Sequence, residues 1–510
     1  MQTNVSFQTF ESSWKAGKAQ VLWRSISADM DSPLSVFIKL KQSDPLAFIM
    51  ESVEGGAIRG RYTFMGLNPD LVWRSLSGSA EVNRTANLAP NCFTHDGEAM
   101  ESLRRLIEES HIDLPDHLPP MSAGLAGYMG YDMVRLAEKL PNPNPDTIGI
   151  PDSLFIRPTI MAVLDNARDV LTIITPVRPN SAMSAEHVFE AAMGRINEAI
   201  ARLQKPATEA TAVWKEGLQA NNKPLAPTSN TTREQFRGMV ERAKEYIANG
   251  DVFQVVLSQR FRIPLKTSPL SFYRALRRTN PSPFLFFFDQ GEFSLVGSSP
   301  EILVRLHDKT VTVRPLAGTR KRGATPEEDK QLEEDLLSDT KEISEHLMLL
   351  DLGRNDVGRV ARPGTVRVTQ KMSVERYSHV MHIVSNVEGQ IADNHDAIAA
   401  LMAGFPAGTV SGAPKVRAME IIDELESEKR SFYAGAFCYI SANGQLDTCI
   451  TLRTGLIKDG ELIIQAGAGI VADSNPDSEY EECINKAMAL VRSAQTAGES
   501  LSRAEEQAYI

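Results

Sequence analysis

The sequence predicts an α+β protein built from antiparallel strands and flanking helices. Two hairpin turns, Asn443-Gly444 and Asp459-Gly460, separate short apolar runs and predict three antiparallel strands in succession. A turn at Asp165-Asn166 predicts another hairpin, and the stretch "GRYTFMGLNPDLVWRSL" predicts a strand pair broken at Asn68-Pro69. The helical patterns after residue 231 lack the regular strand–helix period of a doubly wound parallel sheet. We therefore expect antiparallel sheet in both halves of the chain.

The clearest boundary in the chain is a segment rich in Asn, Pro and Thr between Lys215 and Phe236. It ends in Thr232-x-x-Gln235, a capping box that predicts the start of a helix running through Ile247. The expected organisation is an N-terminal region over residues 1–214, a linker over 215–231, a second region over 232–492 and a polar tail over 493–510.

Composition and charge exclude several classes of function. The 510 residues include 54 Lys plus Arg against 65 Asp plus Glu, and this net charge of −11 argues against a nucleic-acid partner. No apolar run approaches the roughly 20 residues that span a bilayer, and the first residues lack a secretory or transit pattern. Four scattered cysteines show neither a CxxC pair nor zinc-ligand spacing. We expect a cytoplasmic protein with free thiols.

Two predicted helices each carry a pair of glutamates one turn apart. "KEISEHLMLLDLGRND" contains Glu342 and Glu345, and "SEYEECINKAMALVR" contains Glu479 and Glu482. Each pair alone is consistent with a solvated helix edge. Together the two pairs could place hard oxygen ligands around one divalent cation, and Mg²⁺ suits few carboxylates with substrate anions completing the shell.

Three further features are candidates for substrate chemistry. The loop "FPAGTVSGAPK" precedes a helix, so its amides, with Thr409 and Lys415, could bind a carboxylate or phosphate; the alternative is a structural loop. His382 lies in an apolar run and is either a core residue or a shielded acid–base group. Arg453 suits a substrate carboxylate or a surface ion pair. Without a catalytic triad or nucleotide motif, the expected chemistry is metal- and acid–base-assisted, on a small polyanion.

Ordered motifs from Gly250 to Lys486 give the chain a family resemblance. They include "GDVFQVVLSQRF", "GSSPEILVR", "RPLAGTRKRG", "YSHVMHIVSNVEG" and "QAGAGIVADSNPDSEYEECINKA". With the stretches quoted above, they resemble the chorismate-utilising enzymes, and most closely the large subunits of anthranilate synthases. The resemblance implies two antiparallel sheets packed as a sandwich with helices outside and with the two halves of the chain intertwined.

The resemblance also implies a reaction, in which chorismate and ammonia yield anthranilate and pyruvate with Mg²⁺ as cofactor. Glu301 matches the general acid for the departing ring hydroxyl, and nearby acids with low dielectric could keep it protonated. His382 matches the histidine of the second step, proton removal with loss of pyruvate. The implied metal ligands are Glu345 and Glu482, with Glu342 and Glu479 beside them. The implied substrate-binding positions are Ala317, Gly318, Thr319, Thr409, Tyr433, Arg453, Gly467, Ala468, Gly469 and Lys486.

Two positions discriminate among members of this family by product. Members that add water use a lysine base where this chain has Gln254, which cannot deprotonate water. Members that make aminodeoxychorismate carry a lysine nucleophile where this chain has Ala317. Both favour anthranilate as product. The alternatives are an aminodeoxychorismate synthase, an amino-deoxyisochorismate synthase that stops at the intermediate, and a catalytically silent subunit that binds chorismate or tryptophan.

The resemblance further implies partners and regulation. No cysteine lies in the GxCxG elbow of a glutamine amidotransferase, so we expect a separate glutaminase subunit, in a heterotetramer of two large and two small subunits. Relatives begin tryptophan biosynthesis and are inhibited by tryptophan, although ordinary strand packing would also explain the corresponding residues. The expected inhibitor positions are Glu51, Ser52, Asn280, Pro281, Ser282, Pro283, Phe284 and Leu285.

Overall fold

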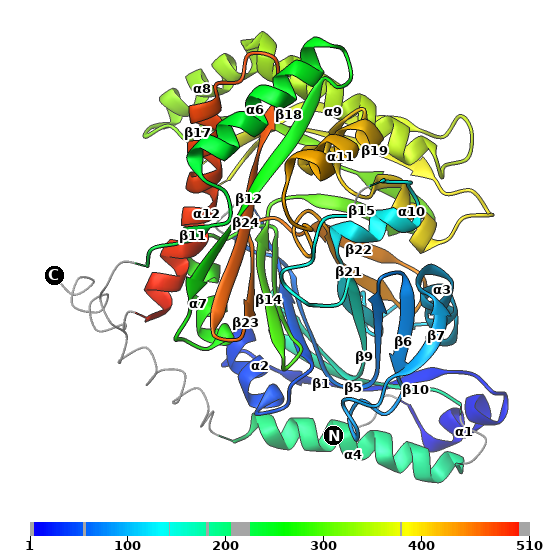
Figure 1. Ribbon diagram of the computed structural model, residues 1–510. Coiled ribbons are helices and arrows are strands. Elements are labelled where there is room, and N and C mark those ends of the chain that lie inside the picture. The colour runs from blue at the N-terminus through cyan, green and yellow to red at the C-terminus, as the bar shows by residue number, and fades with distance from the viewer. Residues whose placement is uncertain are drawn as a thin grey trace.

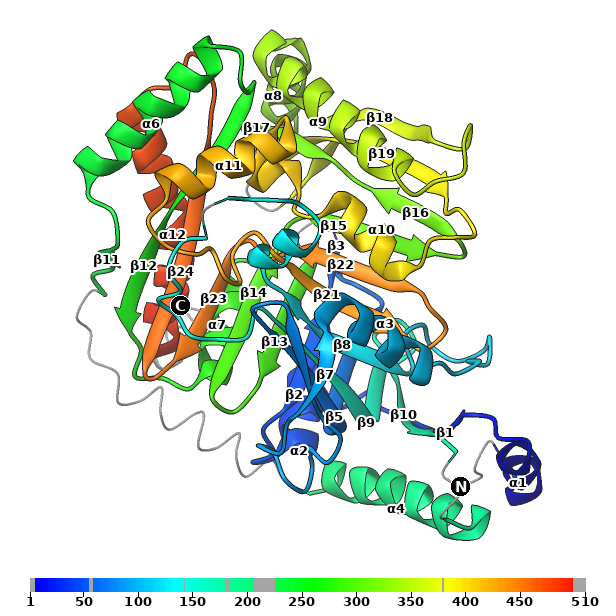
Figure 2. The ribbon, with the colours of Figure 1, turned by 45° about the vertical axis from the view of Figure 1, so that its right-hand side comes forward.

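A computed structural model describes residues 5–54, 58–141, 143–179, 183–205, 225–377 and 380–498. Its strands form two curved sheets with helices on the outside, which confirms the predicted α+β class (Figures 1 and 2). The two sheets share the long strands β5 (Tyr62–Leu76) and β9 (Ser153–Asp165), which pair along their length. The sandwich is therefore one continuous hydrogen-bonded network.

The strand order of each sheet follows from the pairings. The first sheet runs through β1 (Gln20–Ser27), β10 (Val170–Val177), β9, β5, β2 (Ala47–Glu51), β13 (Phe284–Asp289), β14 (Phe293–Ser299), β23 (Thr454–Lys458), β24 (Glu461–Ile470) and β12 (Gln254–Pro264), with β11 (Thr228–Ser229) and β20 (Gly412–Ala413) on β12. The second runs through β7 (Thr94–Glu98), β6 (Ser79–Asn83), β5, β9, β8 (Gly124–Met129), β21 (Ala436–Ser441), β22 (Leu446–Ile450), β15 (Ile302–His307), β16 (Thr310–Val313) and β19 (Val380–Gln390), with β17 (Leu316–Lys321) and β18 (Arg367–Arg376) on β19. A short separate pair joins β3 (Val53–Glu54) and β4 (Ile58–Arg59).

Helices cover the outer faces. One core under α1 (Phe7–Lys15), α2 (Pro33–Lys41), α4 (Ala185–Leu203), α7 (Pro269–Thr279) and α12 (Pro476–Gly498) packs on the first sheet. The remaining helical segments are α3 (Ala99–Glu109), α6 (Arg233–Ala248), α8 (Pro326–Ser338), α9 (Thr340–Gly358), α10 (Ala397–Gly404), α11 (Lys415–Leu425), η1 (Tyr131–Leu136) and η3 (Gly408–Val410). The core between the two sheets includes Phe286 of β13 and Phe437 of β21, whose rings stack with centroids 4.1 Å apart.

Two sequence expectations about strands were wrong. The segment around Asn68-Pro69 is one strand, β5, that bends where Asn68 has φ +49° and the register shifts after Pro69. The three-stranded meander is instead two hairpins, β21–β22 and β23–β24. β22 pairs with β15 and β23 with β14, so the chain crosses between sheets at Thr451–Arg453. Turn residues specify a hairpin but carry no information about which sheet receives it.

Other local expectations were confirmed. The hairpin at Asp165-Asn166 joins β9 and β10. Thr232 and Gln235 form the capping box that starts α6, which ends at Ala248. The helices expected to carry the glutamate pairs are α9, capped by the Asp339 carboxylate, and α12.

The two halves of the chain are interleaved in both sheets. Strand β2 pairs with β13, and β8 pairs with β21. Of the expected linker, residues 225–231 are described and include β11, while residues 215–224 lie outside the described part. Helix α12 continues to Gly498, and residues 499–510 of the expected tail lie outside the described part. Among the described helices, none is long and apolar enough to cross a membrane.

Candidate active site

A cavity of about 610 Å³ gathers most of the residues that the sequence singled out. Its walls come from the start of β12, from β17, β19 and β24, from the η3 turn and from helices α9 and α12. The expected residues that line it are Gln254, Glu301, Ala317, Gly318, Thr319, Glu342, Glu345, His382, Thr409, Tyr433, Arg453, Gly467, Gly469, Glu479, Glu482 and Lys486. Ala468 is not brought to the cavity, because alternation along β24 buries it in the core beneath α6 and α11.

Glu301 lies at the sheet end between β14 and β15, with 7% of its surface exposed. The Thr409 hydroxyl lies 3.1 and 3.2 Å from its two carboxyl oxygens. Burial raises the pKa of Glu301 to about 8, although the bond from Thr409 opposes the rise. At neutral pH this carboxyl group is therefore mostly protonated and can act as a general acid.

His382 lies on β19, beside β17. Its Nδ1 is 2.9 Å from the Thr319 hydroxyl and 3.3 Å from the Gly318 carbonyl oxygen. Donation from Nδ1 to this carbonyl leaves Nε2 as the basic nitrogen. Burial lowers the pKa of His382 to about 4, so the ring is neutral at neutral pH and can accept a proton.

The four glutamates line the cavity from two helices. Burial raises the pKa of Glu345, with smaller contributions from Glu342 and Glu482. Burial also raises the pKa of Glu479, and Glu482 adds to the rise. Like charges facing one space are the arrangement that a divalent cation relieves.

Each acid pair also has protein partners. Glu342 accepts from Arg320 at 3.0 Å and from the Thr319 amide at 3.3 Å, and Glu482 pairs with Lys486 at 2.6 Å. Within the described ranges, no group of three or more His, Cys, Asp or Glu side chains is close enough to hold a metal. The donor set, all hard carboxylate oxygens, nevertheless fits Mg²⁺, which typically uses one or two protein carboxylates with water and substrate oxygens.

Gln254 occupies the cavity wall next to Glu345, with 5% of its surface exposed. Its Nε2 lies 3.5 Å from the Glu345 carboxylate. Its Oε1 is buried and accepts no hydrogen bond from the described residues. A buried carbonyl oxygen without a donor is costly, so this atom is suited to a ligand that carries N–H groups.

Cationic side chains complete the cavity. Arg453, in the crossover between the sheets, has φ +46° and forms no ion pair with the described residues. Burial lowers its pKa. Lys486 donates to the Gly467 carbonyl at 3.0 Å in addition to its pair with Glu482. The surface ion pair considered for Arg453 is therefore not observed, and the guanidinium can face a substrate carboxylate.

The expected anion cradle in the loop before α11 was wrong. The Ser411 amide donates to the Gly408 carbonyl, and Gly412–Ala413 pair with β12. Lys415 is buried in an ion pair with Asp356 at 2.9 Å. These groups are bonded within the fold, so of this loop only Thr409 and Val410 line the cavity.

The expected inhibitor residues divide between three neighbouring cavities. A cavity of about 160 Å³ beside β2 and β13 is lined by Glu51, Ser52, Phe284 and Leu285. Another of about 990 Å³ is lined by residues 280–283 and part of the active-site rim. A third, about 330 Å³, extends from Ser52 to Glu301. The Glu51 carboxylate, however, is bonded to Tyr273 at 2.9 Å and Arg277 at 2.6 Å.

Sequence reasoning missed several lining residues. Tyr377 lies with its ring 5.6 Å from that of His382 and lines the two larger neighbouring cavities. Lys341, Gln465 and Ser474 also line the active-site cavity. A lysine immediately before Glu342 was the available signal for Lys341. Tyr377 directly follows β18, and its amide donates to the Val380 carbonyl at the start of β19, so its closeness to His382 in the sequence was the available signal.

Comparisons with known proteins agree with this geometry. The model of a family described as chorismate binding enzyme matches residues 68–492. "Anthranilate synthase component 1" of Cereibacter sphaeroides is 54% identical over 495 residues, covering 97% of this chain and 98% of that protein. The Pseudomonas putida protein of the same name is 47% identical over 480 residues, with coverages of 93% and 95%.

Solved structures show the same relationship. Anthranilate synthase component I from Streptococcus pneumoniae superposes with a TM-score of 0.74 at 38% identity, covering 92% of this chain and 99% of that one. MenF, a menaquinone-specific isochorismate synthase from Escherichia coli, has a TM-score of 0.67 at 21% identity. The superposition covers 96% of this chain and 100% of MenF, which shares the fold. With a family model across most of its length and relatives of this identity, the chain belongs to the chorismate-binding enzymes.

Proposed function

We propose that this chain is the large subunit of an anthranilate synthase, converting chorismate and ammonia to anthranilate and pyruvate. The observation that carries the proposal is one cavity that combines a protonated, buried Glu301, a neutral His382 and four glutamates. The names and extents of the relatives at 41–54% identity support it.

The glutamates are the proposed magnesium ligands. Glu345 and Glu482 would hold Mg²⁺, with Glu342 and Glu479 beside them. Bound there, the ion would supply Lewis-acid polarisation of the substrate through its ring carboxylate. Arg453 and Lys486 would bind the remaining carboxylate oxygens of a dianionic substrate.

The remaining steps belong to the chain's own side chains. As ammonia adds to the ring, the Glu301 carboxyl group donates its proton to the departing hydroxyl, which leaves as water, while Thr409 holds Glu301 in place. The Gln254 Oε1 accepts an N–H of the incoming ammonia. In the second step, His382 Nε2 removes the ring proton while the ring carbon–oxygen bond to the enolpyruvyl group breaks. The proton then passes to the departing enolpyruvate, which becomes pyruvate.

Two residues disfavour the reactions of related enzymes that use chorismate. Ala317 lines the cavity and offers no nucleophile, which disfavours an aminodeoxychorismate synthase. Gln254 has no basic nitrogen with which to activate water. The position of His382 favours completion of the second step, which an amino-deoxyisochorismate synthase does not carry out. A catalytically silent binding subunit would not need these acidic and basic side chains.

We further propose that a glutaminase subunit supplies the ammonia, in a heterotetramer of two large and two small subunits in the cytoplasm, at the first committed step of tryptophan synthesis. Tryptophan is the proposed inhibitor, bound in the cavity beside Ser52, Phe284 and Leu285. Glu51 also lines this cavity, while its carboxylate is engaged by Tyr273 and Arg277 of α7.

The direct test is incubation of the purified chain with chorismate, Mg²⁺ and an ammonium salt while anthranilate fluorescence is followed. We expect anthranilate with ammonium and none with glutamine unless a glutaminase subunit is added. Glu301→Gln is the matched inactive variant. A chain that accumulates aminodeoxychorismate or leaves chorismate unchanged would disprove the proposal.

A further inference from the structure

Arg430, just after α11, is a buried cation that touches several walls of the cavity at once. Only 1% of its side chain is exposed. Its Nε and Nη2 donate to the two carboxylate oxygens of Glu426, at 2.9 and 2.6 Å. Its Nη1 donates to the Val410 carbonyl and its Nη2 to the Val256 carbonyl, each at 2.7 Å. Each guanidinium nitrogen is thus engaged.

These two carbonyl groups belong to the backbone that presents functional side chains. Val410 directly follows Thr409, whose hydroxyl contacts Glu301. Val256 lies two residues after Gln254 on β12, and both residues line the cavity. The guanidinium therefore ties the η3 turn to β12, and with them the cavity-lining side chains of Thr409 and Gln254.

Aromatic contacts extend this bridge. The guanidinium carbon of Arg430 lies 4.9 Å from the ring centre of Tyr131 and 5.5 Å from that of Tyr433. Tyr433 lines the cavity, whereas Tyr131 belongs to η1, in the N-terminal half. Glu426 in turn accepts from the amide and hydroxyl of Ser258, both at 2.8 Å.

A buried ion pair is a poor source of stability, because desolvation of both charges offsets their attraction. The planar guanidinium offers instead a rigid fork that a lysine cannot reproduce. The donors of Arg430 all bond to backbone carbonyl groups of the cavity wall or to Glu426. Arg430 is therefore suited to holding these parts of the cavity wall in a fixed geometry.

We propose that Arg430 is a positioning residue for the proposed reaction, holding the Thr409 turn against Glu301 and the ring of Tyr433 against the substrate. This inference rests on the proposed function. It also gives the N-terminal half a part in the site, through Tyr131.

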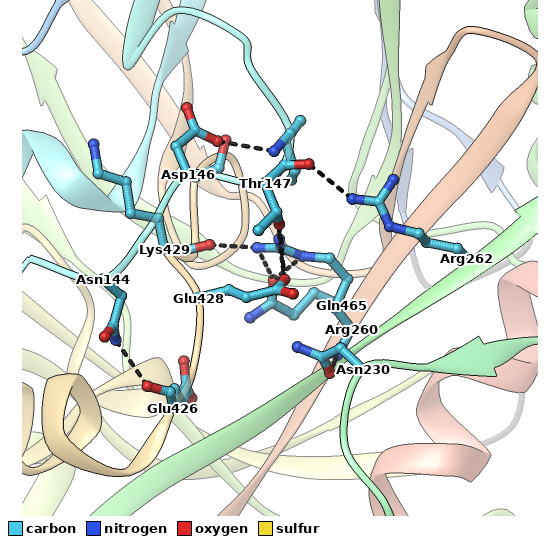
Figure 3. Close-up of polar contacts among 12 residues, drawn as sticks. Asn144, Asp146, Thr147, Asn230, Arg260, Arg262, Glu426, Glu428, Lys429 and Gln465 are labelled. Atoms are coloured by element: carbon cyan, nitrogen blue, oxygen red, sulfur yellow. Dashed lines mark hydrogen bonds and ion pairs between the residues drawn. The ribbon is translucent and has the colours of Figure 1, made fainter.

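The chain offers a matched control in Arg260. Its side chain is also 1% exposed and pairs with Glu428 at 2.7 Å, and it binds Thr147 and Gln465 (Figure 3). Figure 3 shows this second network joining the loop around Thr147 to the Glu428–Lys429 segment. Arg260 bonds the cavity-lining Gln465, but it donates to neither the Thr409 turn nor Val256, the two contacts on which the inference rests.

The test compares Arg430→Lys with Arg260→Lys in the full chain, using chorismate, Mg²⁺ and ammonium. We expect Arg430→Lys to lower kcat by roughly 10- to 100-fold with KM little changed. Its alkaline activity limit should move upward, because loss of the Thr409 contact removes an interaction that lowers the pKa of Glu301. Arg260→Lys should lose a similar amount of thermal stability but keep the kcat and the alkaline activity limit of the parent.

A second measurement does not depend on activity. Titration of carboxyl-¹³C-glutamate-labelled free protein by NMR, with Glu301 assigned through Glu301→Gln, should show the Glu301 midpoint raised in Arg430→Lys and unchanged in Arg260→Lys. An unchanged midpoint, with activity falling only in proportion to the folded fraction, would overturn the inference. If the parent chain makes no anthranilate, the proposed function fails, and the titration still decides whether Arg430 positions Glu301.

Discussion

At the scale of single residues, burial places the pKa of a carboxyl group above that of an imidazole, the reverse of their usual order. Glu301 has a pKa raised to about 8 and His382 one lowered to about 4, both chiefly by desolvation. Between these values the carboxyl group carries its proton and the imidazole does not. At neutral pH one cavity therefore holds a protonated carboxyl group and a neutral imidazole, the forms that the proposed general acid and general base require.

Replacement of Glu301 by Gln should lower kcat by about 100-fold or more, because the amide cannot donate the proton that the leaving hydroxyl needs. The raised pKa contributes stability below the ordinary value of the carboxyl group and loses it as pH rises through about 8. The melting temperature of Glu301→Gln should therefore fall less than that of the parent between pH 5 and 8.5. Parallel melting curves for the two proteins would contradict the assignment.

Replacement of His382 by Asn should block the second step more than the first, since Nε2 is the proposed base for the ring proton. We expect anthranilate formation to fall by about 100-fold while an amino-deoxyisochorismate intermediate accumulates, as measured by chromatography of the products. In the parent, the lowered pKa of His382 places its acid limit of activity below pH 5. A histidine-dependent limit near pH 6.5 would be inconsistent with the buried ring.

The sequence located cavity-lining residues where a motif or a spacing names the side chain. The pairs at Glu342–Glu345 and Glu479–Glu482 follow from helical periodicity, and the resemblance supplies Glu301 and Thr409. It failed where orientation depends on tertiary packing. Ala468 points away by strand alternation, and Lys415 is consumed by Asp356.

At the scale of elements, the strands β2 and β13 connect the proposed inhibitor cavity to the catalytic one. They pair along residues 47–51 and 285–289, and Ser52 follows directly. Ser52 lines both the 160 Å³ cavity and the 330 Å³ cavity that reaches Glu301. A ligand beside Ser52 thus lies next to a cavity whose wall includes Glu301, the proposed general acid.

Replacement of Ser52 by Arg should relieve tryptophan inhibition, because the larger cation would fill the small cavity. We expect the half-inhibitory tryptophan concentration to rise at least about tenfold with kcat little changed, as measured by anthranilate fluorescence. Replacement of Phe284, on the paired strand β13, by Ala should also raise the half-inhibitory tryptophan concentration. Unchanged tryptophan sensitivity in both variants would exclude this cavity as the inhibitor site.

The sequence identified helices and turns more securely than strand partners. Caps and hairpin turns are local, so α6, α9 and the β23–β24 hairpin could be predicted. The separation of β22 from β23 into different sheets depends on their partners β15 and β14, whose paired residues lie at least 140 positions earlier in the chain. Such non-local pairing has no signature in a short window.

At the scale of the whole molecule, the catalytic half depends on the N-terminal half. Strand β13 needs β2 as its neighbour and β21 needs β8, so the segment 232–492 alone would expose two strand edges. We expect this segment, expressed alone, to be aggregated or to lack a cooperative thermal transition, while the full chain melts cooperatively. Circular dichroism with calorimetry measures this; a cooperative transition in the isolated segment would show an independent domain.

The proposed function depends on one cavity that holds both chorismate and a magnesium ion between α9 and α12. The most direct measurement is anthranilate formation from chorismate and ammonium by protein freed of divalent metal and by the double variant Glu345→Ala, Glu482→Ala. Activity should fall to background in both, return with Mg²⁺ only in the parent, and be accompanied by unchanged melting of the double variant. Undiminished turnover in either protein would contradict the claim.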